Sequence, residues 1–486
     1  MFIKRKDYIE ILDKMFQANH EKLQPFFGKN FWPVIHIQTG YFFHLLFNKK
    51  FENSSPNESQ INHSSFTIND LFELLKVCVR VFIAKKKVDK KNVSSDCLLV
   101  GFYEHITPSG ENIYLDPLVP FLSERGKSFT KLYLRSPSSS VTKPSLEYLY
   151  KCLDDLYFLL FKLKYTYNRY FREQNNIAYK NSIIISSWLK DKCVPYETFV
   201  EHRIYKSLLQ SEVKLRVFKA LLTILKPKKV WTYCYYDNTV LSLSKAGKDL
   251  GIPVIEYQHS LQDDNHFAYC KWQNIDEYNS FFPSHFWVWR ASDKKRIERN
   301  FSESIFRPTA ILGGNIYLGL KKRAHYIAQK KENNVLICLQ GQWIPSFLEN
   351  FIKDDENFIW HIRLHPRYPE DKVSLLKLKE RYPIKIEIEK ANSLSLYELF
   401  NIVKFNITAF SGTALEAQAW GVKNIIFSEE GYSSFRQQII RKEFAFVTTE
   451  EDLQNALSSE SFSFEFDKIE TDLNVVSNAL QVIYDA

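Results

Sequence analysis

Basic side chains gather in one short stretch of this sequence, His361-Ile-Arg363-Leu-His365-Pro366-Arg367. If the stretch is a strand, alternation puts His361, Arg363 and His365 on one face, which is unusual for a buried strand. Pro366 would end the strand and leave His365 and Arg367 at its carboxyl end. Several N–H donors and positive charge in one place suit a phosphate or diphosphate. A solvent-facing edge strand with a structural histidine is the alternative interpretation.

Small hydroxyl residues and a glycine, Ser411-Gly412-Thr413, stand between a strand-like run and a helical pattern. The first N–H groups of a helix have no partner within it and can bind an anion. Thr413 and Glu416 also have the spacing of a capping box, which would require them only to start the helix. Because such a cap leaves other N–H groups unpaired, we expect ligand contact at Ser411 or Thr413 in either case.

Two weaker candidates follow other strand-like runs of the C-terminal half. Gly341 and Gln342 would form a tight turn that lets a ligand approach the backbone, although a plain turn explains them equally well. Glu429 and Glu430 either hold sugar or ribose hydroxyls or form an exposed acidic turn.

Three polar residues of the first half also come directly after strand-like runs: Glu104, Asp237 and His259. An imidazole at such a place can accept a proton near neutral pH, since its ordinary pKa is about 6.5. Asp237 or its neighbour Asn238 is also well placed to cap the helix that follows. A lone histidine is often structural, so both interpretations of His259 stay open.

The segments that must position these residues alternate between apolar strands and amphipathic helices. The pattern predicts strands at 97–102, 183–185, 230–235, 254–257, 286–289 and 310–312, and again at 335–339, 359–364, 384–388, 405–408 and 424–427. Strands separated by helices imply βαβ units and parallel sheets, hence an α/β fold. Ligands of such sheets bind beyond the carboxyl ends of the strands, where the candidate residues are expected.

A chain of 486 residues is longer than one ordinary core supports. The polar and basic segment 319–334 separates the two strand–helix systems. We therefore expect a helical N-terminal extension at 1–95, one Rossmann-like domain at 96–320, a second at 335–470 and a C-terminal helix at 471–486.

The formal charge of +9 is densest in one run, Lys85, Lys86, Lys87, Lys90 and Lys91. A solvated loop and a contact with anionic lipid are the two interpretations of that run. Nucleic acid is not expected, because no binding motif accompanies the charge.

The seven cysteines are scattered without a CxxC pair, which favours a reducing compartment over disulfides or zinc. Neither a signal peptide nor an apolar run of ~18 residues is visible. We expect a cytoplasmic protein, with peripheral contact to the inner face of the membrane as an option.

Several runs together resemble a known family: LHPRYPED, TAFSGTALEAQAWGVKNIIFSEEG, GIPVIEYQHS, FWVW and LGGN. They look like the GT-B-fold glycosyltransferases that make bacterial capsule and lipopolysaccharide O-antigen. The His-Pro pair and the Ser/Thr loop are also similar to sialyltransferases and Kdo transferases, which use CMP-activated sugars. The resemblance covers roughly residues 97–445. The family often has His-Gly where this chain has His259-Ser260, so the backbone turn there is in doubt.

The resemblance implies two Rossmann-like domains whose parallel sheets face a central cleft, with an activated nucleotide sugar held by the C-terminal domain. By this resemblance His365 contacts the nucleotide phosphate, and Ser411 and Thr413 hold phosphate or nucleotide. The remaining predicted donor-binding residues are Gly341, Gln342, Arg363, Arg367, Gly412 and Glu416. The N-terminal domain would bind the acceptor, a growing surface glycan or a lipid-linked glycan.

Glycosyl transfer also needs a base for the acceptor proton. His259 is the leading candidate, followed by Asp237 and Glu104. We expect no essential metal, because no Asp-Asp pair follows a strand as a metal site would require. We also expect an inverting enzyme without a cofactor. A CMP-linked ulosonic acid is slightly favoured as the donor.

Three alternatives stay open: a CDP-polyol phosphotransferase, a sugar-nucleotide 2-epimerase with the same two-domain fold, and a non-catalytic glycan-binding scaffold. Turnover of CMP-, UDP- and CDP-linked donors with and without an acceptor separates them, because an epimerase needs no acceptor and a scaffold releases no nucleotide.

Overall fold

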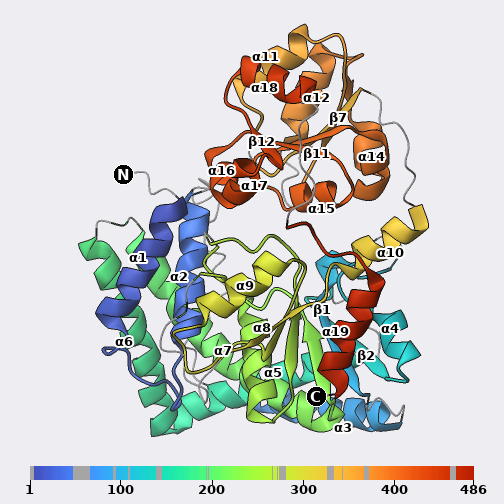
Figure 1. Cartoon of the computed structure of the whole chain (residues 1–486). Helices are drawn as coiled ribbons and strands as arrows, with labels where there is room; N and C mark the ends of the chain where they lie inside the picture. Colours follow the sequence, from blue (N-terminus) through green and yellow to red (C-terminus); the bar gives the residue numbers. More distant parts are fainter. Residues whose placement is uncertain are drawn as a thin grey trace. The chain divides into compact units, whose positions relative to one another are not determined.

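The computed structural model describes residues 5–47, 66–90, 95–107, 110–137, 145–192, 194, 196–264, 266–270, 272, 281–325, 333–341, 343–365, 371–459 and 467–485. The chain divides into two compact units (Figure 1). The first unit consists of residues 1–259, 266–287 and 295–311, and the second of residues 260–265, 288–294 and 312–486. Each unit contains a six-stranded sheet.

The sheet of the first unit has the strand order β2-β1-β3-β4-β5-β6. Its strands are β1 (Cys97–Phe102), β2 (Phe129–Leu134), β3 (Lys229–Thr232), β4 (Val254–Tyr257), β5 (His285–Val288) and β6 (Thr309–Leu312). The pairings from β2 through β1, β3 and β4 to β5 are parallel. The order reverses between β1 and β3, and this reversal is the switch point at which doubly wound sheets bind ligands.

The sheet of the second unit has the order β12-β11-β10-β7-β8-β9, and its strands are all parallel. They are β7 (Asn334–Cys338), β8 (Ile359–Arg363), β9 (Ile386–Glu387), β10 (Phe405–Thr408), β11 (Lys423–Ile426) and β12 (Phe444–Phe446). Counted from β7, this is the 3-2-1-4-5-6 order of dinucleotide-binding sheets. Its switch point lies between β7 and β10.

Buried side chains on both faces, most of them apolar, are typical of the central strands. β1 and β10 are buried at every position, as strands covered by helices on both sides should be. A hydrophobic core around Val335, Ile337, Trp360 and Ile407 fills the space between the second sheet and its helices. The expected α/β class is thereby confirmed: two parallel six-stranded sheets with helices before the first, a GT-B-like architecture.

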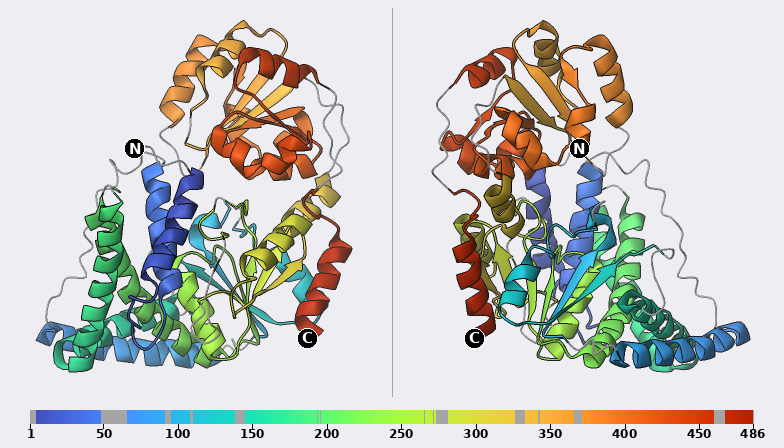
Figure 2. Two further views of the ribbon diagram at one scale, coloured as in Figure 1. Left: turned by 60° about the vertical axis from the view of Figure 1, so that its left-hand side comes forward. Right: turned by 90° about the vertical axis from the view of Figure 1, so that its right-hand side faces the viewer.

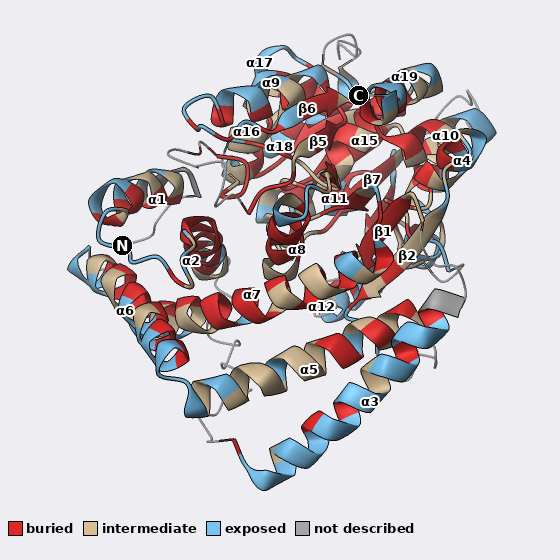
Figure 3. Cartoon of the chain, turned by 90° about the horizontal axis from the view of Figure 1, so that it is seen from below, coloured by how far each residue is buried: buried red, intermediate tan, exposed pale blue. Residues whose placement is uncertain are grey.

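The helices of the first unit form successive layers. They are α1 (Arg5–Asn19), α2 (Trp32–Phe47), α3 (Ile68–Lys90), α4 (Leu118–Glu124), α5 (Leu146–Tyr167), α6 (Arg169–Asp191), α7 (Glu197–Leu225) and α8 (Asn238–Asp249), and α9 (Ala291–Asn300) connects β5 to β6. Helix α8 contacts β4, and α7 packs on α8. Helices α2, α5 and α6 contact α7, and α3 contacts α5 (Figure 3).

The second sheet also has helices on both faces (Figure 2). The helices of this unit are α10 (Ile316–His325), α11 (Ser346–Asp354), α12 (Asp371–Arg381), α13 (Glu389–Ser393), α14 (Leu396–Ile402), α15 (Thr413–Ala419), α16 (Glu429–Ser434), α17 (Arg436–Ile440), α18 (Glu450–Ser458) and α19 (Leu473–Asp485). Helix α15 packs on β10 and β11, α11 contacts α18, and α10 contacts α19. The helix expected at 471–486 is α19. The domain boundary expected at 319–334 stays a prediction.

Two expectations about local structure are wrong. Residues 183–185 are not a strand, because they lie within α6, whose buried stripe includes Ala178, Ser182, Ile185 and Leu189. That spacing is helical, and of the three isoleucines only Ile185 belongs to the buried stripe of α6, which packs on α7. The lysine run from Lys85 does not form a loop, since α3 extends to Lys90. Lys91 lies outside the described residues.

Among the helices that the structure describes, none is long and apolar enough to cross a membrane.

Candidate functional site

The switch point of the first sheet is organised around Tyr233, which follows β3. Its phenol oxygen accepts hydrogen bonds from the Phe102 N–H (2.9 Å) and the Asn112 amide (3.0 Å). The same oxygen lies 3.1 Å from Nδ1 of His105. Burial raises the pKa of Tyr233 above its usual range, so it remains a neutral phenol. Tyr233 therefore ties the end of β1 to the end of β3.

An arginine joins the two candidate carboxylates of this region. Arg135 directly follows β2, and its Nη1 donates to Glu104 at 2.7 Å. Its Nη2 donates to Oδ2 of Asp237. Oδ1 of Asp237 accepts the N–H of Thr239 at 2.8 Å, so Asp237 caps α8, as expected of one residue of that pair. Residues that are far apart in the sequence thus meet at one edge of the sheet.

His259 lies after β4 among tyrosine rings of the first unit. Its Nε2 is 3.2 Å from the hydroxyl of Tyr236. The rings of Tyr114 and Tyr233 each have their centroid 5.9 Å from that of His259. Both carboxylate oxygens of Asp237 accept N–H donors, whereas Oε1 of Glu104 accepts one from Arg135.

A buried acid in the same region was not foreseen from the sequence. Glu256 is the third residue of β4 and is completely buried. Burial raises its pKa to about 8, and the hydroxyl of Tyr269 donates to its Oε1 at 2.8 Å. The remaining oxygen, Oε2, has no hydrogen-bond partner among the described residues. The only signal in the sequence was an acidic residue inside a four-residue apolar run.

The switch point of the second sheet is built from backbone and small side chains. Gly341, which follows β7, has a φ of +73°, a conformation that suits glycine. The Thr408 hydroxyl donates to the carbonyl of Cys338 (3.0 Å) and holds the ends of β10 and β7 together. Oε1 of Gln340 is buried at this place without a hydrogen-bond partner in the described part of the chain. Gln342 lies outside the described residues.

The loop from Ser411 to Thr413 turns the chain from β10 into α15. The hydroxyl of Ser411 accepts the N–H of Thr413 at 3.3 Å. Gly412 is the N-cap of α15 and has no side chain to cap it. The predicted capping box of Thr413 and Glu416 is therefore wrong. The Glu416 carboxyl is instead buried and accepts the Tyr397 hydroxyl at 2.8 Å, and burial raises its pKa to about 7.

Two basic side chains of the stretch at β8, His361 and Arg363, bind other parts of the second unit. Strand β8 pairs with β7 and β9, so the edge-strand interpretation is wrong. Nη1 of Arg363 donates to the carbonyls of Ala391 and Leu394 at 2.8 and 2.7 Å. His361 is buried next to Asn334 at 3.2 Å, and burial lowers its pKa. His365 is half-buried just beyond the strand, and Arg367 lies outside the described residues.

The acidic turn after β11 has a structural role at its first position. The Ser428 hydroxyl accepts the N–H of Gly431 at 3.0 Å and donates to the carbonyl of Ala409 at 2.8 Å. Glu429 and Glu430 then form the first turn of α16, where negative charge stabilises a helix.

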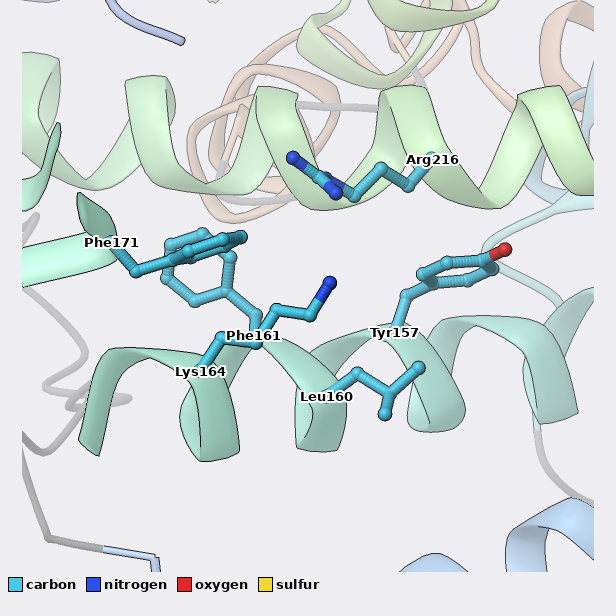
Figure 4. A pocket seen from close by; sticks show the side chains of 6 residues that line it. All are labelled: Tyr157, Leu160, Phe161, Lys164, Phe171 and Arg216. Carbon is cyan, nitrogen blue, oxygen red and sulfur yellow. The ribbon is translucent and has the colours of Figure 1, made fainter. Parts of the chain in front are cut away.

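A pocket in the helical layer is separate from the strand ends (Figure 4). Its lining residues come from α5, α6 and α7: Tyr157, Leu160, Phe161, Lys164, Phe171 and Arg216. Nε and Nη2 of Arg216 both donate to Glu212, at 2.9 and 2.6 Å. This pocket contains none of the residues that follow strands, so we do not assign the chemistry to it.

Within the described residues, no group of three or more His, Cys, Asp or Glu side chains is arranged to hold a metal ion.

No family model and no curated protein matches this chain. Among solved structures it is similar to the UDP-GlcNAc 2-epimerase of Methanocaldococcus jannaschii in complex with UDP-GlcNAc and UDP. The identity is 13%, the match covers 80% of this chain and 99% of that one, and the TM-score is 0.46.

Two further similar structures are named for lipopolysaccharide and for wall teichoic acid. The lipopolysaccharide outer core galactosyltransferase WaaB is 12% identical, with coverage of 80% and 96% and a TM-score of 0.38. The wall teichoic acid polymerase TagF is 10% identical, with coverage of 87% and 93% and a TM-score of 0.38. The fold class of this chain rests on its own two sheets rather than on these likenesses.

Proposed function

We propose that this protein is a glycosyltransferase that moves a sugar from a nucleotide-activated donor to a surface glycan or lipid-linked glycan. The observation that carries the proposal is the switch point between β7 and β10. A glycine at positive φ and a hydroxyl loop meet there in a sheet with the strand order of nucleotide-binding folds. A CMP-linked ulosonic acid is the favoured donor.

In this proposal the second unit holds the nucleotide. His365 contacts the diphosphate or phosphate, and the Ser411–Thr413 loop, together with the Gly341 turn, supplies backbone and hydroxyl donors. Such donors stabilise the negative charge that develops on the departing phosphate. Arg363 uses Nη1 for the backbone of the α13 region, so its contribution is the placement of the strand end as well as positive charge.

The first unit binds the acceptor and supplies the base. The acceptor oxygen attacks the anomeric carbon, the bond from that carbon to the phosphate oxygen breaks, and His259 takes the acceptor proton. The rings of Tyr114, Tyr233 and Tyr236 offer apolar faces with polar edges beside this imidazole, which suits a sugar. Arg135 orients Glu104 and Asp237 at the same sheet edge.

Donor binding is tested with His365→Ala and Thr413→Ala, measured by calorimetric titration with CMP, UDP and CDP. Losing one hydrogen bond to a charged group should weaken binding of the preferred nucleotide by about 1.5–3 kcal/mol, which is roughly tenfold to a hundredfold. The exposed Thr448, which binds Asp452 at the start of α18, offers a matched control in Thr448→Ala. Normal affinity in both site variants would overturn the donor assignment.

The reaction class is tested separately by incubating sugar nucleotides with and without acceptor glycans. Transfer requires an acceptor and releases the nucleotide in step with the new linkage. Epimerisation of a donor without an acceptor would replace the proposal, and so would transfer of a polyol phosphate from a CDP-polyol to the acceptor with release of CMP.

A further inference from the structure

Helix α3 has two apolar faces. Within the described part of the chain, α5 is the one helix that packs extensively against it. Its inner face consists of Leu74, Val77, Ala84 and Val88, which are all buried. These positions recur every three to four residues and face α5. The inner face therefore accounts for the attachment of α3 to the first unit (Figure 3).

The outer face carries large apolar side chains that the fold leaves in solvent. They are Ile68 (74% exposed), Leu71 (46%), Phe72 (58%), Leu75 (58%), Val79 (58%), Phe82 (58%) and Ile83 (45%). Their spacing of three and four residues aligns them along one side of the helix, opposite the inner face. A continuous apolar stripe of this length on a protein surface marks an interaction site.

Basic residues border this outer stripe. Lys76 and Arg80 lie beside it and both pair with Glu73, whereas Lys85, Lys86 and Lys87 are exposed near its C-terminal end. The ammonium of Lys86 stands 4.5 Å from the ring centroid of Phe82, so charge and apolar surface are adjacent. Apolar side chains on one face with lysines at its border are the arrangement of helices that lie in the interface of a bilayer.

We propose that α3 docks on an anionic lipid bilayer, with the outer stripe in the acyl boundary and the lysines on lipid phosphates. Charge complementarity favours this occupant over a protein groove, because the border of the stripe and the whole chain (+9) are basic. The helix is not apolar enough to span the bilayer, so it lies along the surface. The inference is independent of the proposed sugar transfer.

The test uses the full chain and vesicles of phosphatidylcholine, with and without phosphatidylglycerol, in a flotation assay. The wild type should float with the anionic vesicles and bind the neutral ones much more weakly. Phe72→Asp with Phe82→Asp should reduce the partition coefficient at least tenfold. Ile305→Asp with Val373→Asp is the matched control, because those residues are 77% and 61% exposed elsewhere.

The charge contribution is tested with Lys85→Gln, Lys86→Gln and Lys87→Gln together. At about 1 kcal/mol per lysine, binding to anionic vesicles should fall roughly a hundredfold. Lys353→Gln, Lys372→Gln and Lys377→Gln, all exposed in the second unit, should change it little. All variants should keep the wild-type melting temperature, since the substituted side chains are in solvent.

Two results would overturn the proposal. One is an absence of vesicle binding by the wild type, or binding that the α3 substitutions leave unchanged. The other is a concentration-dependent dimer, seen by sedimentation velocity without lipid, that dissociates in the Phe72→Asp/Phe82→Asp variant, because the stripe would then belong to a second copy of the chain.

Discussion

The switch points of the two sheets are built from different kinds of chemical groups. In the first unit, side chains from separate loops bind one another: Tyr233 holds the end of β1, and Arg135 holds Glu104 and Asp237. In the second unit, backbone and small side chains dominate, with Gly341 at positive φ and the Ser411–Thr413 loop before α15.

The difference indicates a division of work. A network of fixed side chains suits a proton acceptor, because the ring that accepts the proton must be oriented before the reaction. Backbone N–H groups and hydroxyls suit a phosphate, which accepts several hydrogen bonds from any suitable direction. The predictions below test whether the two switch points differ in this way.

The largest effect is expected at His259. His259→Ala should lower turnover ~10²-fold or more and leave donor affinity nearly unchanged, because a base acts on the acceptor proton and not on the nucleotide. Turnover and nucleotide affinity are measured on the same preparation, and His202→Ala, on the surface of α7, serves as the control. Near-normal turnover would move the base to Glu104 or Asp237.

A second comparison concerns two glutamates, the fully buried Glu256 in the first unit and the half-buried Glu416 in the second. Their pKa values are raised from 4.5 to about 8 and about 7 by burial. Below pH 4.5 both the folded and unfolded states hold the proton. As the pH rises, each carboxyl ionises first in the unfolded chain. Each group therefore lowers the free energy of unfolding by up to about 1.4 kcal/mol per pH unit, until the pH reaches the pKa of that group in the folded state.

Glu256→Gln should therefore flatten the fall in stability between pH 4.5 and 8, and Glu416→Gln should flatten it only up to pH 7. Urea midpoints of wild type and variants at pH 5, 6.5 and 8 measure this, with exposed Glu380→Gln as the control. Curves for Glu256→Gln that run parallel to the wild type would contradict the assignment of a neutral buried acid.

A smaller effect is expected at the cap of α8. Asp237→Ala should lower the free energy of unfolding by about 1 kcal/mol, because the N–H of Thr239 loses its acceptor. Asp237→Asn keeps a capping oxygen and should recover most of that loss while it removes the charge that faces Arg135. Equal urea midpoints for the wild type and the alanine variant would show that the cap contributes little.

Much of the fold could be predicted from the sequence, because the central strands are short apolar runs bounded by turn signals. β1, β4 and β10 were predicted with the boundaries that the structure has, and either Asp237 or Asn238 was expected to cap the helix that is α8. Strands β2 and β12 were missed: β2 mixes Thr130 and Lys131 with apolar residues, and β12 has only three residues.

Tertiary structure alone decided which of the candidate residues meet. Arg135 binds Glu104 and Asp237, which are 31 and 102 residues away in the sequence. A local sequence pattern does not predict a contact over such a separation. The strand order decided that the Gly341 turn and the Ser411–Thr413 loop share a switch point. Burial decided that Glu416 binds Tyr397 rather than the start of its own helix. Local sequence determines which segments become strands and helices, whereas contacts between distant segments set burial, strand order and the protonation of the acids.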